Sequence, residues 1–373
     1  MISPEYFYNY LLKNNIEFFA GVPDSLLKDI CAYITDHSSK KNHIIAANEG
    51  NAIALAAGYH MATDKIPLVY MQNSGIGNAV NPLLSLTDDD VYKIPVLLMI
   101  GWRGEKKDEP QHVKQGKVTT DLLDAMQIPY LILDSDEQNA QKQIDEALLK
   151  IQETNTAFAI IIRKGTFEKY SIKQKIESDY TLFREDAIKI IIDQLQGDEL
   201  LVSTTGKTSR ELFEYREELN QKHHADFLTV GSMGHASQIA LGIAINKPNR
   251  KIICIDGDGA VLMHMGGFAI IGSQSPENFL HIIINNGAHE SVGGQPTVAF
   301  DINIPKIAKA NNYKYAISVS SADELKEALA NLNKSSYPAL IEVMTKIGSR
   351  DNLGRPTIKP VDNKKDFMRN LSQ

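Results

Sequence analysis

Short apolar runs alternate with longer segments of helical periodicity along this 373-residue chain. The runs divide evenly between the two halves and span residues 17–22, 43–48, 67–72, 95–100, 130–134, 158–163, 200–204, 225–230, 251–256, 280–285, 314–319 and 339–344. Because apolar runs separated by helical segments favour βαβ units, the pattern predicts parallel sheets covered by helices. A chain of this length is sufficient for two such domains, at about 100–200 residues each.

Two long stretches repeat one order of elements. Residues 43–75 place a strand, a glycine-bearing turn, an alanine-rich helix and a second strand in succession. Residues 225–259 repeat this order at nearly the same length. The repetition indicates two domains of one topology, as an old duplication would leave them.

The segment between the halves, residues 166–183, is charged and poor in apolar periodicity. Such composition is typical of a linker. We therefore predict an α/β protein with two doubly wound parallel-sheet domains, residues 1–165 and residues 184–373, joined by this linker.

Charge and composition exclude several classes of protein. The net charge of −7 and the isoelectric point of about 5.8 argue against nucleic-acid binding. The two cysteines, Cys31 and Cys254, are too few for a disulfide framework or a zinc site. The N-terminus lacks a basic region followed by an apolar stretch, and no run of eighteen apolar residues occurs, so we expect a cytoplasmic protein without membrane association.

The segment LLVSTTGKTSREL contains what looks like the end of an ATP-binding loop. That loop needs a glycine five residues before its last glycine, Gly206, and Leu201 stands there instead. Leucine cannot supply the required loop conformation. The sequence therefore disfavours an ATPase, although a strand, a turn of small hydroxyl residues and a helix remain.

Polar turns follow two successive strands of the second half. Gly257-Asp258-Gly259 ends one strand and Asn285-Asn286 ends the next, with 25 residues between Gly259 and Asn285. Because that interval accommodates one helix, over residues 261–274, and one strand, we expect both turns at the same edge of the sheet. A carboxylate, an amide oxygen and a nearby carbonyl form the hard oxygen site that Mg²⁺ uses while it shares a phosphate ligand.

This combination resembles the signature of the thiamine diphosphate (ThDP) enzymes. The resemblance implies Mg²⁺ ligation by Asp258, by Asn286 and by the carbonyl of Ala288, with Asn285 as the alternative asparagine. It also implies that Glu49, in ANEGNA, contacts N1′ of the aminopyrimidine. The first domain would then bind the pyrimidine and the second the diphosphate.

Further cofactor contacts follow from the same resemblance. The turn GSMG would supply the Gly231 carbonyl and the bulky Met233 that bends ThDP, and STTGKTS would contact the diphosphate. The full set of residues that the resemblance assigns to the cofactor is Glu49, Thr205, Gly206, Gly231, Met233, Gly257, Asp258, Gly259, Ala260, Asn286 and Ala288.

Nearly the whole chain is similar to the phosphonopyruvate decarboxylases, and also to the sulfopyruvate decarboxylases. Both lack the middle domain of most ThDP decarboxylases. The segments GVPDSLLK, DEPQHVKQG, STTGKTSRELFE and SRDNLGRPT carry this similarity. It implies loss of CO₂ from 3-phosphonopyruvate to give phosphonoacetaldehyde, a step of phosphonate biosynthesis. It also implies a homo-oligomer, at least a dimer, with active sites at the subunit interface.

The resemblance assigns catalytic roles to Glu49 and to His112, the second as a proton donor. The residues that it places around the anionic 2-oxo acid substrate are Asp24, Gln72, Asn73, Ser74, Gln111 and Lys207. Arg210, Arg350 and Arg355 are further candidates for the substrate's anionic group. Decarboxylation of sulfopyruvate, a ThDP-dependent carboligase or synthase, and a binding subunit without activity remain alternatives.

Overall fold

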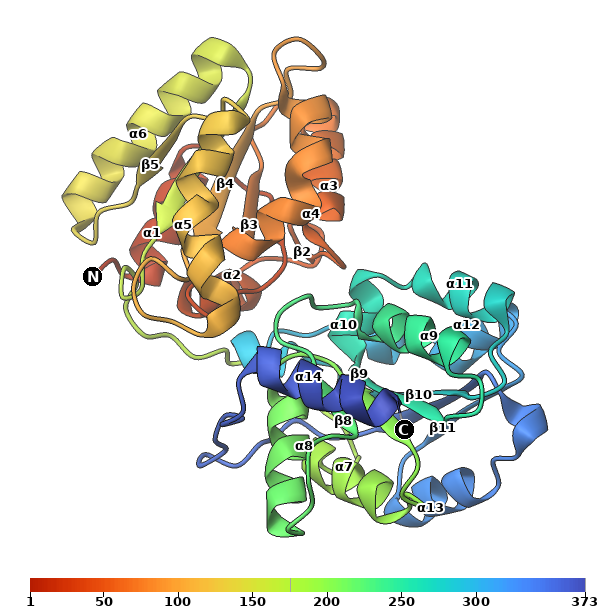
Figure 1. The fold of residues 1–373 in the computed structure, drawn as a ribbon. Helices are drawn as coiled ribbons and strands as arrows, with labels where there is room; N and C mark the ends of the chain where they lie inside the picture. The colour runs from red at the N-terminus through yellow and green to blue at the C-terminus, as the bar shows by residue number, and fades with distance from the viewer. Residues whose placement is uncertain (175, 373) are drawn as a thin grey trace. The chain divides into compact units, whose positions relative to one another are not determined.

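The computed structural model describes residues 1–174 and 176–372 of the protein. The chain divides into two compact units (Figure 1). One comprises Met1–Lys175 with His289–Gln295, and the other comprises Ile176–Ala288 with Pro296–Gln373. Lys175, in the predicted linker, and Gln373, at the end of the predicted second domain, lie outside the described residues.

The first unit is built on a sheet of six parallel strands in the order β2-β1-β3-β4-β6-β5 within the described residues. The strands are β1 (Phe19–Gly21), β2 (His43–Ile45), β3 (Leu68–Gln72), β4 (Val96–Gly101), β5 (Tyr130–Ile132) and β6 (Ala157–Ile162). The α-helices are α1 (Pro4–Lys13), α2 (Lys28–His37), α3 (Glu49–Thr63), α4 (Ile76–Pro82), α5 (Pro110–Ala125) and α6 (Glu137–Thr154).

Helices cover both faces of this sheet. One apolar core joins the sheet to α1, α2 and α6, and the other joins it to α3, α4 and α5. The central strands β3, β4 and β6 are buried along almost their entire length. This two-sided burial explains why they are continuous apolar runs in the sequence, without alternation of polar residues.

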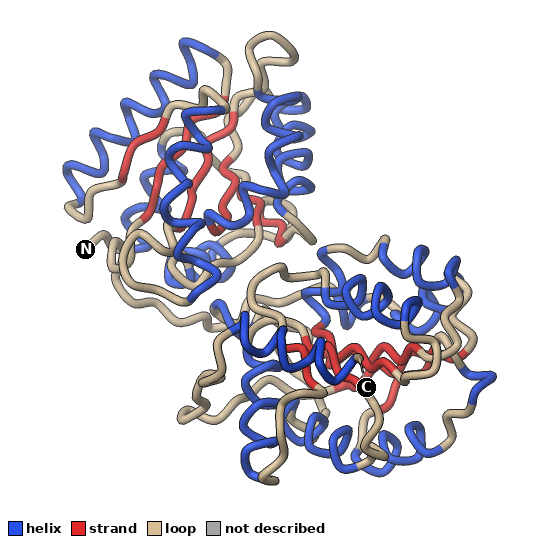
Figure 2. Tube along the Cα trace, viewed as in Figure 1, coloured by secondary structure: helices blue, strands red, loops and turns tan. Residues whose placement is uncertain are grey.

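The second unit has the same architecture, with six parallel strands in the order β11-β12-β10-β9-β7-β8 within residues 176–372. The strands are β7 (Leu200–Ser203), β8 (Asp226–Leu228), β9 (Ile252–Gly257), β10 (Phe279–Asn285), β11 (Tyr315–Val319) and β12 (Ala339–Met344). The α-helices are α7 (Arg184–Asp193), α8 (Lys207–Glu218), α9 (Ala236–Asn246), α10 (Asp258–Met263), α11 (Gly267–Gln274), α12 (Ile304–Ala310), α13 (Ala322–Ala330) and α14 (Pro360–Leu371). Helices α7, α8 and α13 pack on one face and α9 to α12 and α14 on the other, as the layers in Figure 2 show.

The two sheets share one topology. When the strands of each unit are numbered from one to six, both sheets have the order 2-1-3-4-6-5. The repeat in the sequence therefore corresponds to a repeat of the fold, and β3 and β4 of the first unit match β9 and β10 of the second. All twelve predicted apolar runs form strands, which confirms the predicted fold class.

One element differs from its prediction. Residues 261–274 were expected to form a single helix, and the structure has two, α10 and α11, separated by residues 264–266. Gly266 lies at the start of α11, and glycine is unfavourable inside a helix because of its backbone entropy. Within the described residues, none of the helices combines the length and the hydropathy needed to cross a bilayer.

Candidate active site

Asp258 lies at the carboxyl end of β9, where it begins α10, and its side chain is almost fully buried. Burial raises the pKa of Asp258 to about 6, although backbone N–H groups of Gly259 and Asn286 donate to its carboxylate. The hydroxyl of Thr297 donates a further hydrogen bond of 2.5 Å to Oδ2. A buried carboxylate with only neutral donors is poorly stabilised, and a cation would compensate its charge.

The Asn285-Asn286 turn lies beside Asp258 because β9 and β10 are neighbouring parallel strands. Its two asparagines have different surroundings. Asn285 donates through Nδ2 to Oε1 of Glu342 at 2.8 Å, and its Oδ1 accepts the N–H of Gly287. Asn286 follows the strand, and its Oδ1 accepts the N–H of Ala288 at 3.1 Å. Both amides therefore make hydrogen bonds within the protein, and Asn285 is the more deeply buried of the two.

The turns after β7 and β8 approach each other at the same edge of the sheet. Thr205 accepts the N–H of Gly231 through its hydroxyl at 3.1 Å. Gly206, with φ of +98°, precedes α8. Gly234, with φ of +83°, lies so close to α10 that a Cβ there would stand 3.0 Å from the carbonyl of Ala260. Met233, which lies between Gly231 and Gly234 in the sequence, is half-buried.

Lys207 begins α8 at this edge, and its Nζ donates to Oγ of Ser349 at 2.7 Å. Arg350, the next residue in the late SRDNLGRP segment, forms ion pairs with Glu185 and Glu214. These two carboxylates compensate its charge. Through these pairs Arg350 attaches this segment to α7 and α8, and its role as a candidate for the substrate's anionic group stays a prediction.

Glu49 begins α3 in the first unit, immediately after its N-cap, Asn48. Its carboxyl group is buried, and its Oε2 accepts a hydrogen bond of 2.8 Å from Nδ2 of Asn78 on α4. Gly75 makes room for this carboxyl group, because a Cβ at that position would stand 2.6 Å from both Cδ and Cγ of Glu49. The side chain of Glu49 is thus held by the hydrogen bond from Asn78 and by the close approach of the Gly75 backbone.

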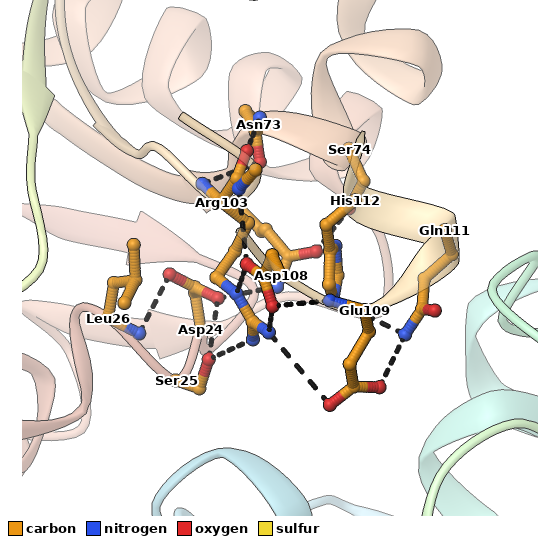
Figure 3. Close-up of polar contacts among 12 residues, drawn as sticks. Asp24, Ser25, Leu26, Asn73, Ser74, Arg103, Asp108, Glu109, Gln111 and His112 are labelled. Carbon is orange, nitrogen blue, oxygen red and sulfur yellow. Dashed lines mark hydrogen bonds and ion pairs between the residues drawn. The ribbon is translucent and has the colours of Figure 1, made fainter. Parts of the chain in front are cut away.

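A second polar cluster surrounds Asp24, which follows β1 and is completely buried (Figure 3). Burial raises the pKa of its carboxyl group, against the effect of a 2.5 Å hydrogen bond from Nε2 of Gln72. Oδ2 accepts the N–H of Leu26 at 3.0 Å. Ser74 extends the chain of contacts by donating to Oε1 of Gln72 at 2.8 Å.

Arg103, after β4, organises the adjacent loop. Its guanidinium forms two hydrogen bonds with Asp108, of 2.7 and 2.6 Å, and one with the hydroxyl of Ser25. This pairing holds the pKa of Asp108 well below its usual range. Asn73 fixes the backbone of Arg103 from the other side, because Nδ2 donates to the Arg103 carbonyl and Oδ1 accepts its N–H.

The start of α5 completes this cluster. Gln111 donates through Nε2 to Oε2 of Glu109 at 2.7 Å and lies 3.4 Å from Nε2 of His112. His112 is buried, and Glu109 lies 4.0 Å from the guanidinium of Arg103. The cluster in Figure 3 therefore combines carboxyl, imidazole and amide groups at the carboxyl edge of the first sheet.

Another group of possible metal ligands lies inside the second unit. Cys254 and Asp256 of β9 and His281 of β10 are all buried, and their ligand atoms lie within 4.8 Å of one another. Nε2 of His281 is 3.5 Å from Oδ2 of Asp256. The imidazole and the carboxyl group therefore face each other, although neither of these two atoms has a hydrogen-bond partner among the described residues.

Comparison with known proteins identifies the family. Residues 3–128 match the N-terminal TPP binding domain of thiamine pyrophosphate enzymes, and residues 204–343 match the C-terminal TPP binding domain. The chain is 31% identical to a phosphonopyruvate decarboxylase of Streptomyces viridochromogenes over 92% of this chain and 88% of that one. This protein belongs to the thiamine diphosphate-dependent decarboxylases.

Two further members of this decarboxylase family resemble the chain. A phosphonopyruvate decarboxylase of Streptomyces hygroscopicus is 32% identical over 91% of this chain and 87% of that one. A sulfopyruvate decarboxylase of Methanosarcina acetivorans is 26% identical over 100% of this chain and 98% of that one. Both alignments span the two units.

The residues at the carboxyl edge of the second sheet fit the diphosphate end of the family's cofactor. Asp258, Asn286 and the Ala288 carbonyl are hard oxygen donors, which suit a divalent cation and a phosphate. A Cβ at Gly257 would meet no atom within 4 Å, so a ligand can approach the backbone there. Thr229, after β8, has a buried hydroxyl without a hydrogen-bond partner among the described residues, as expected where a ligand completes the site.

Sequence patterns located the decarboxylase's turns but not the groups that support them. Asn78, Gly75, Thr297 and Arg103 were missed. Of these, Arg103 had a signal, because it follows a buried strand whose counterpart in the second unit ends at Asn285. The other three contact Glu49 or Asp258 across 26 to 39 residues of sequence, and nothing local marks them.

Proposed function

We propose that this protein decarboxylates 3-phosphonopyruvate to phosphonoacetaldehyde and CO₂, with ThDP and Mg²⁺ as cofactors. The observation that carries the proposal is the adjacency of Asp258 and the Asn286 turn in a chain similar to phosphonopyruvate decarboxylases over nine-tenths of its length. Loss of CO₂ from a 2-oxo acid leaves a carbanion that ordinary side chains cannot delocalise. Bound ThDP supplies the electron sink for it.

The second unit holds the cofactor's diphosphate in this proposal. Asp258, Asn286 and the carbonyl of Ala288 would hold Mg²⁺, which would serve as a template for the diphosphate. The residues that contact the diphosphate through hydroxyl or backbone groups are Thr205, Gly206, Gly257, Gly259 and Ala260. The Gly231 carbonyl and Met233 contact the aminopyrimidine end.

Glu49 exchanges a proton at N1′ of the aminopyrimidine. Its buried position and the hydrogen bond from Asn78 to Oε2 support this role, because they orient the carboxyl group before the cofactor binds. Positioned proton transfer contributes typically about 10²–10⁴-fold to a reaction rate.

The cluster of Figure 3 forms the substrate-facing wall in this proposal. His112 is its proton donor, and the buried position of this imidazole beside the amide of Gln111 supports the assignment. The residues that bind the substrate by hydrogen bonds or charge are Asp24, Gln72, Asn73, Ser74, Gln111 and Lys207. Lys207, at the N-terminus of α8, contributes the positive charge and the helix dipole that favour an anionic group.

We also propose that the protein acts in the cytoplasm as a homo-oligomer, at least a dimer. Leu55 and Met61 on α3 are exposed, with 38% and 72% of their surface accessible, although α3 also carries Glu49. Exposed apolar side chains on a helix beside the site are suited to contact a second copy.

The test is incubation of the purified protein with phosphonopyruvate, ThDP and Mg²⁺, with each omitted in turn and the aldehyde and CO₂ quantified. Phosphonoacetaldehyde that requires all three components is expected, and its absence contradicts the proposal. Sulfopyruvate is the second candidate substrate, favoured by the match across the whole chain. The ratio of kcat/KM for the two substrates decides between them, and product analysis with an added aldehyde reveals a carboligase.

A further inference from the structure

Glu342 lies on β12 and is almost fully buried, with 4% of its surface exposed. Its Oε1 accepts a hydrogen bond of 2.8 Å from Nδ2 of Asn285, and its Oε2 accepts one from the hydroxyl of Ser318 on β11. Both partners are neutral donors. A carboxylate in such a position is costly, since the interior solvates charge poorly. An apolar residue would fill the same place on β12 without that cost.

The partner of Glu342 is at the base of the proposed metal site. Asn285 is completely buried and ends β10. Its Oδ1 accepts the N–H of Gly287 at 3.0 Å, and its carbonyl accepts the N–H of Thr345 at 2.8 Å. Gly287 has a φ of +67°, which turns the chain sharply between the two proposed ligands.

These contacts form a continuous chain across three neighbouring strands. Ser318 on β11 donates to Glu342 on β12, Glu342 accepts from Asn285 on β10, and Asn285 holds the N–H of Gly287. β12 pairs with both β10 and β11, so this arrangement belongs to the framework of the sheet. The turn at 285–288 is thereby fixed from the strand beside it.

We propose that Glu342 is a positioning residue for the metal site and acts through Asn285. By holding the Asn285 amide, it excludes that side chain from the metal and fixes the turn that presents Asn286 and the carbonyl of Ala288. The inference rests on the proposed function, because it takes these two groups as ligands. Partners behind metal ligands affect metal affinity by typically about 10–100-fold.

The experiment measures Mn²⁺ affinity in the presence of saturating ThDP, from the loss of the free-ion signal in electron paramagnetic resonance. Glu342→Leu leaves Nδ2 of Asn285 without its acceptor, and we expect about 10-fold to 100-fold weaker Mn²⁺ binding. Glu342→Gln keeps an acceptor for Asn285, so we expect affinity close to that of the unaltered protein. If the Leu variant loses Mn²⁺ affinity and the Gln variant does not, the effect comes from the hydrogen bond to Asn285 and not from the negative charge of Glu342.

An exchanged pair provides the sharpest test. Asn285→Asp alone places two carboxylates against each other and should weaken Mn²⁺ binding. The double variant Asn285→Asp with Glu342→Gln restores an amide–carboxylate pair with the donor on the other side. The second oxygen of the introduced aspartate can still accept the Gly287 N–H. We expect the double variant to recover Mn²⁺ affinity. If its loss of Mn²⁺ affinity instead equals the sum of the losses in the two single variants, the proposal is overturned.

Glu211→Gln is the matched control, because Glu211 is another buried carboxylate of this unit, paired with Arg184. We expect it to lower thermal stability without changing Mn²⁺ affinity. If Glu342→Leu lowers stability in the same way but leaves Mn²⁺ affinity unchanged, Glu342 is only structural and the proposal is wrong. Failure of the unaltered protein to bind Mn²⁺ with ThDP would instead contradict the proposed function.

Discussion

The amide of Asn78 on α4 donates a 2.8 Å hydrogen bond to Oε2 of Glu49, the first residue of α3. This contact orients the carboxyl group that we propose for proton exchange with the cofactor. The two residues are 29 positions apart and meet because α3 and α4 pack on the same face of the first sheet. The position of Glu49 is thus a product of helix packing.

Replacement of Glu49 by Gln should reduce kcat by at least about 10²-fold, because an amide cannot exchange the proton at N1′. Turnover of phosphonopyruvate measures this effect. ThDP binding, followed separately by isothermal titration calorimetry, should change much less. Turnover close to that of the unaltered protein would remove Glu49 from the mechanism.

Gly75→Ala should displace the same carboxyl group without a change of charge, since the added methyl would overlap Cδ and Cγ of Glu49. We expect a loss of kcat that approaches that of the Gln variant. Gly77→Ala is its matched control, because a Cβ there meets no atom within 4 Å. Equal activities of the two alanine variants would show that the position of Glu49 is not critical.

Asp24→Asn should change how stability depends on pH. The folded protein binds the Asp24 proton more tightly than the unfolded chain, because burial raises the pKa of this group. The free energy of unfolding therefore falls as pH rises from about 4 through the raised pKa. The Asn variant lacks this decrease. Urea unfolding of both proteins from pH 4 to 8 measures it, and a pH-independent difference between them would contradict the assignment.

Arg103→Lys should destabilise the first unit by about 1–3 kcal/mol, because lysine cannot form the two parallel hydrogen bonds to Asp108. Both side chains are largely buried, so solvent screens the pair only in part. Thermal unfolding is the measurement. Arg163→Lys, at a half-exposed pair with Glu105, is the control and should have a much smaller effect.

Met61→Asp should weaken self-association, since it places a charge on the exposed apolar side of α3. Sedimentation velocity over a range of concentrations would show dissociation at higher protein concentration than for the unaltered chain. Met368→Asp, on α14 with 55% exposure, is a comparable change in the other unit. If both variants associate like the unaltered protein, α3 is not the contact surface.

Sequence patterns were most informative for buried strands. The runs at β4, β6 and β10 are apolar because both faces of each sheet are covered, so their positions could be read without a structure. The break between α10 and α11 could not be read in this way, since apolar residues occur on both sides of His264 and Gly266. Apolar periodicity alone does not show where one buried helix ends and another begins.

Asp258, Asn286 and Glu49 could be selected from sequence because each follows a strand in a recognisable turn. Asn285 stayed the alternative to Asn286, since both are asparagines at one strand end. Glu342, which is 57 residues away in the sequence, accepts a hydrogen bond from the amide of Asn285. Likewise, Gly75 and Asn78 show their relation to Glu49 only when α3 and α4 are packed.

The order of apolar and polar residues along the chain by itself determined the fold class and the turns where chemistry is expected. Buried strands need continuous apolar runs, and turns need small polar residues, so both leave a local signal in the sequence. Only the tertiary structure decided which side chains meet and which hydrogen-bond donors are already engaged. It also decided which carboxyl groups have a raised pKa. Those properties depend on partners and burial that distant segments of the chain supply.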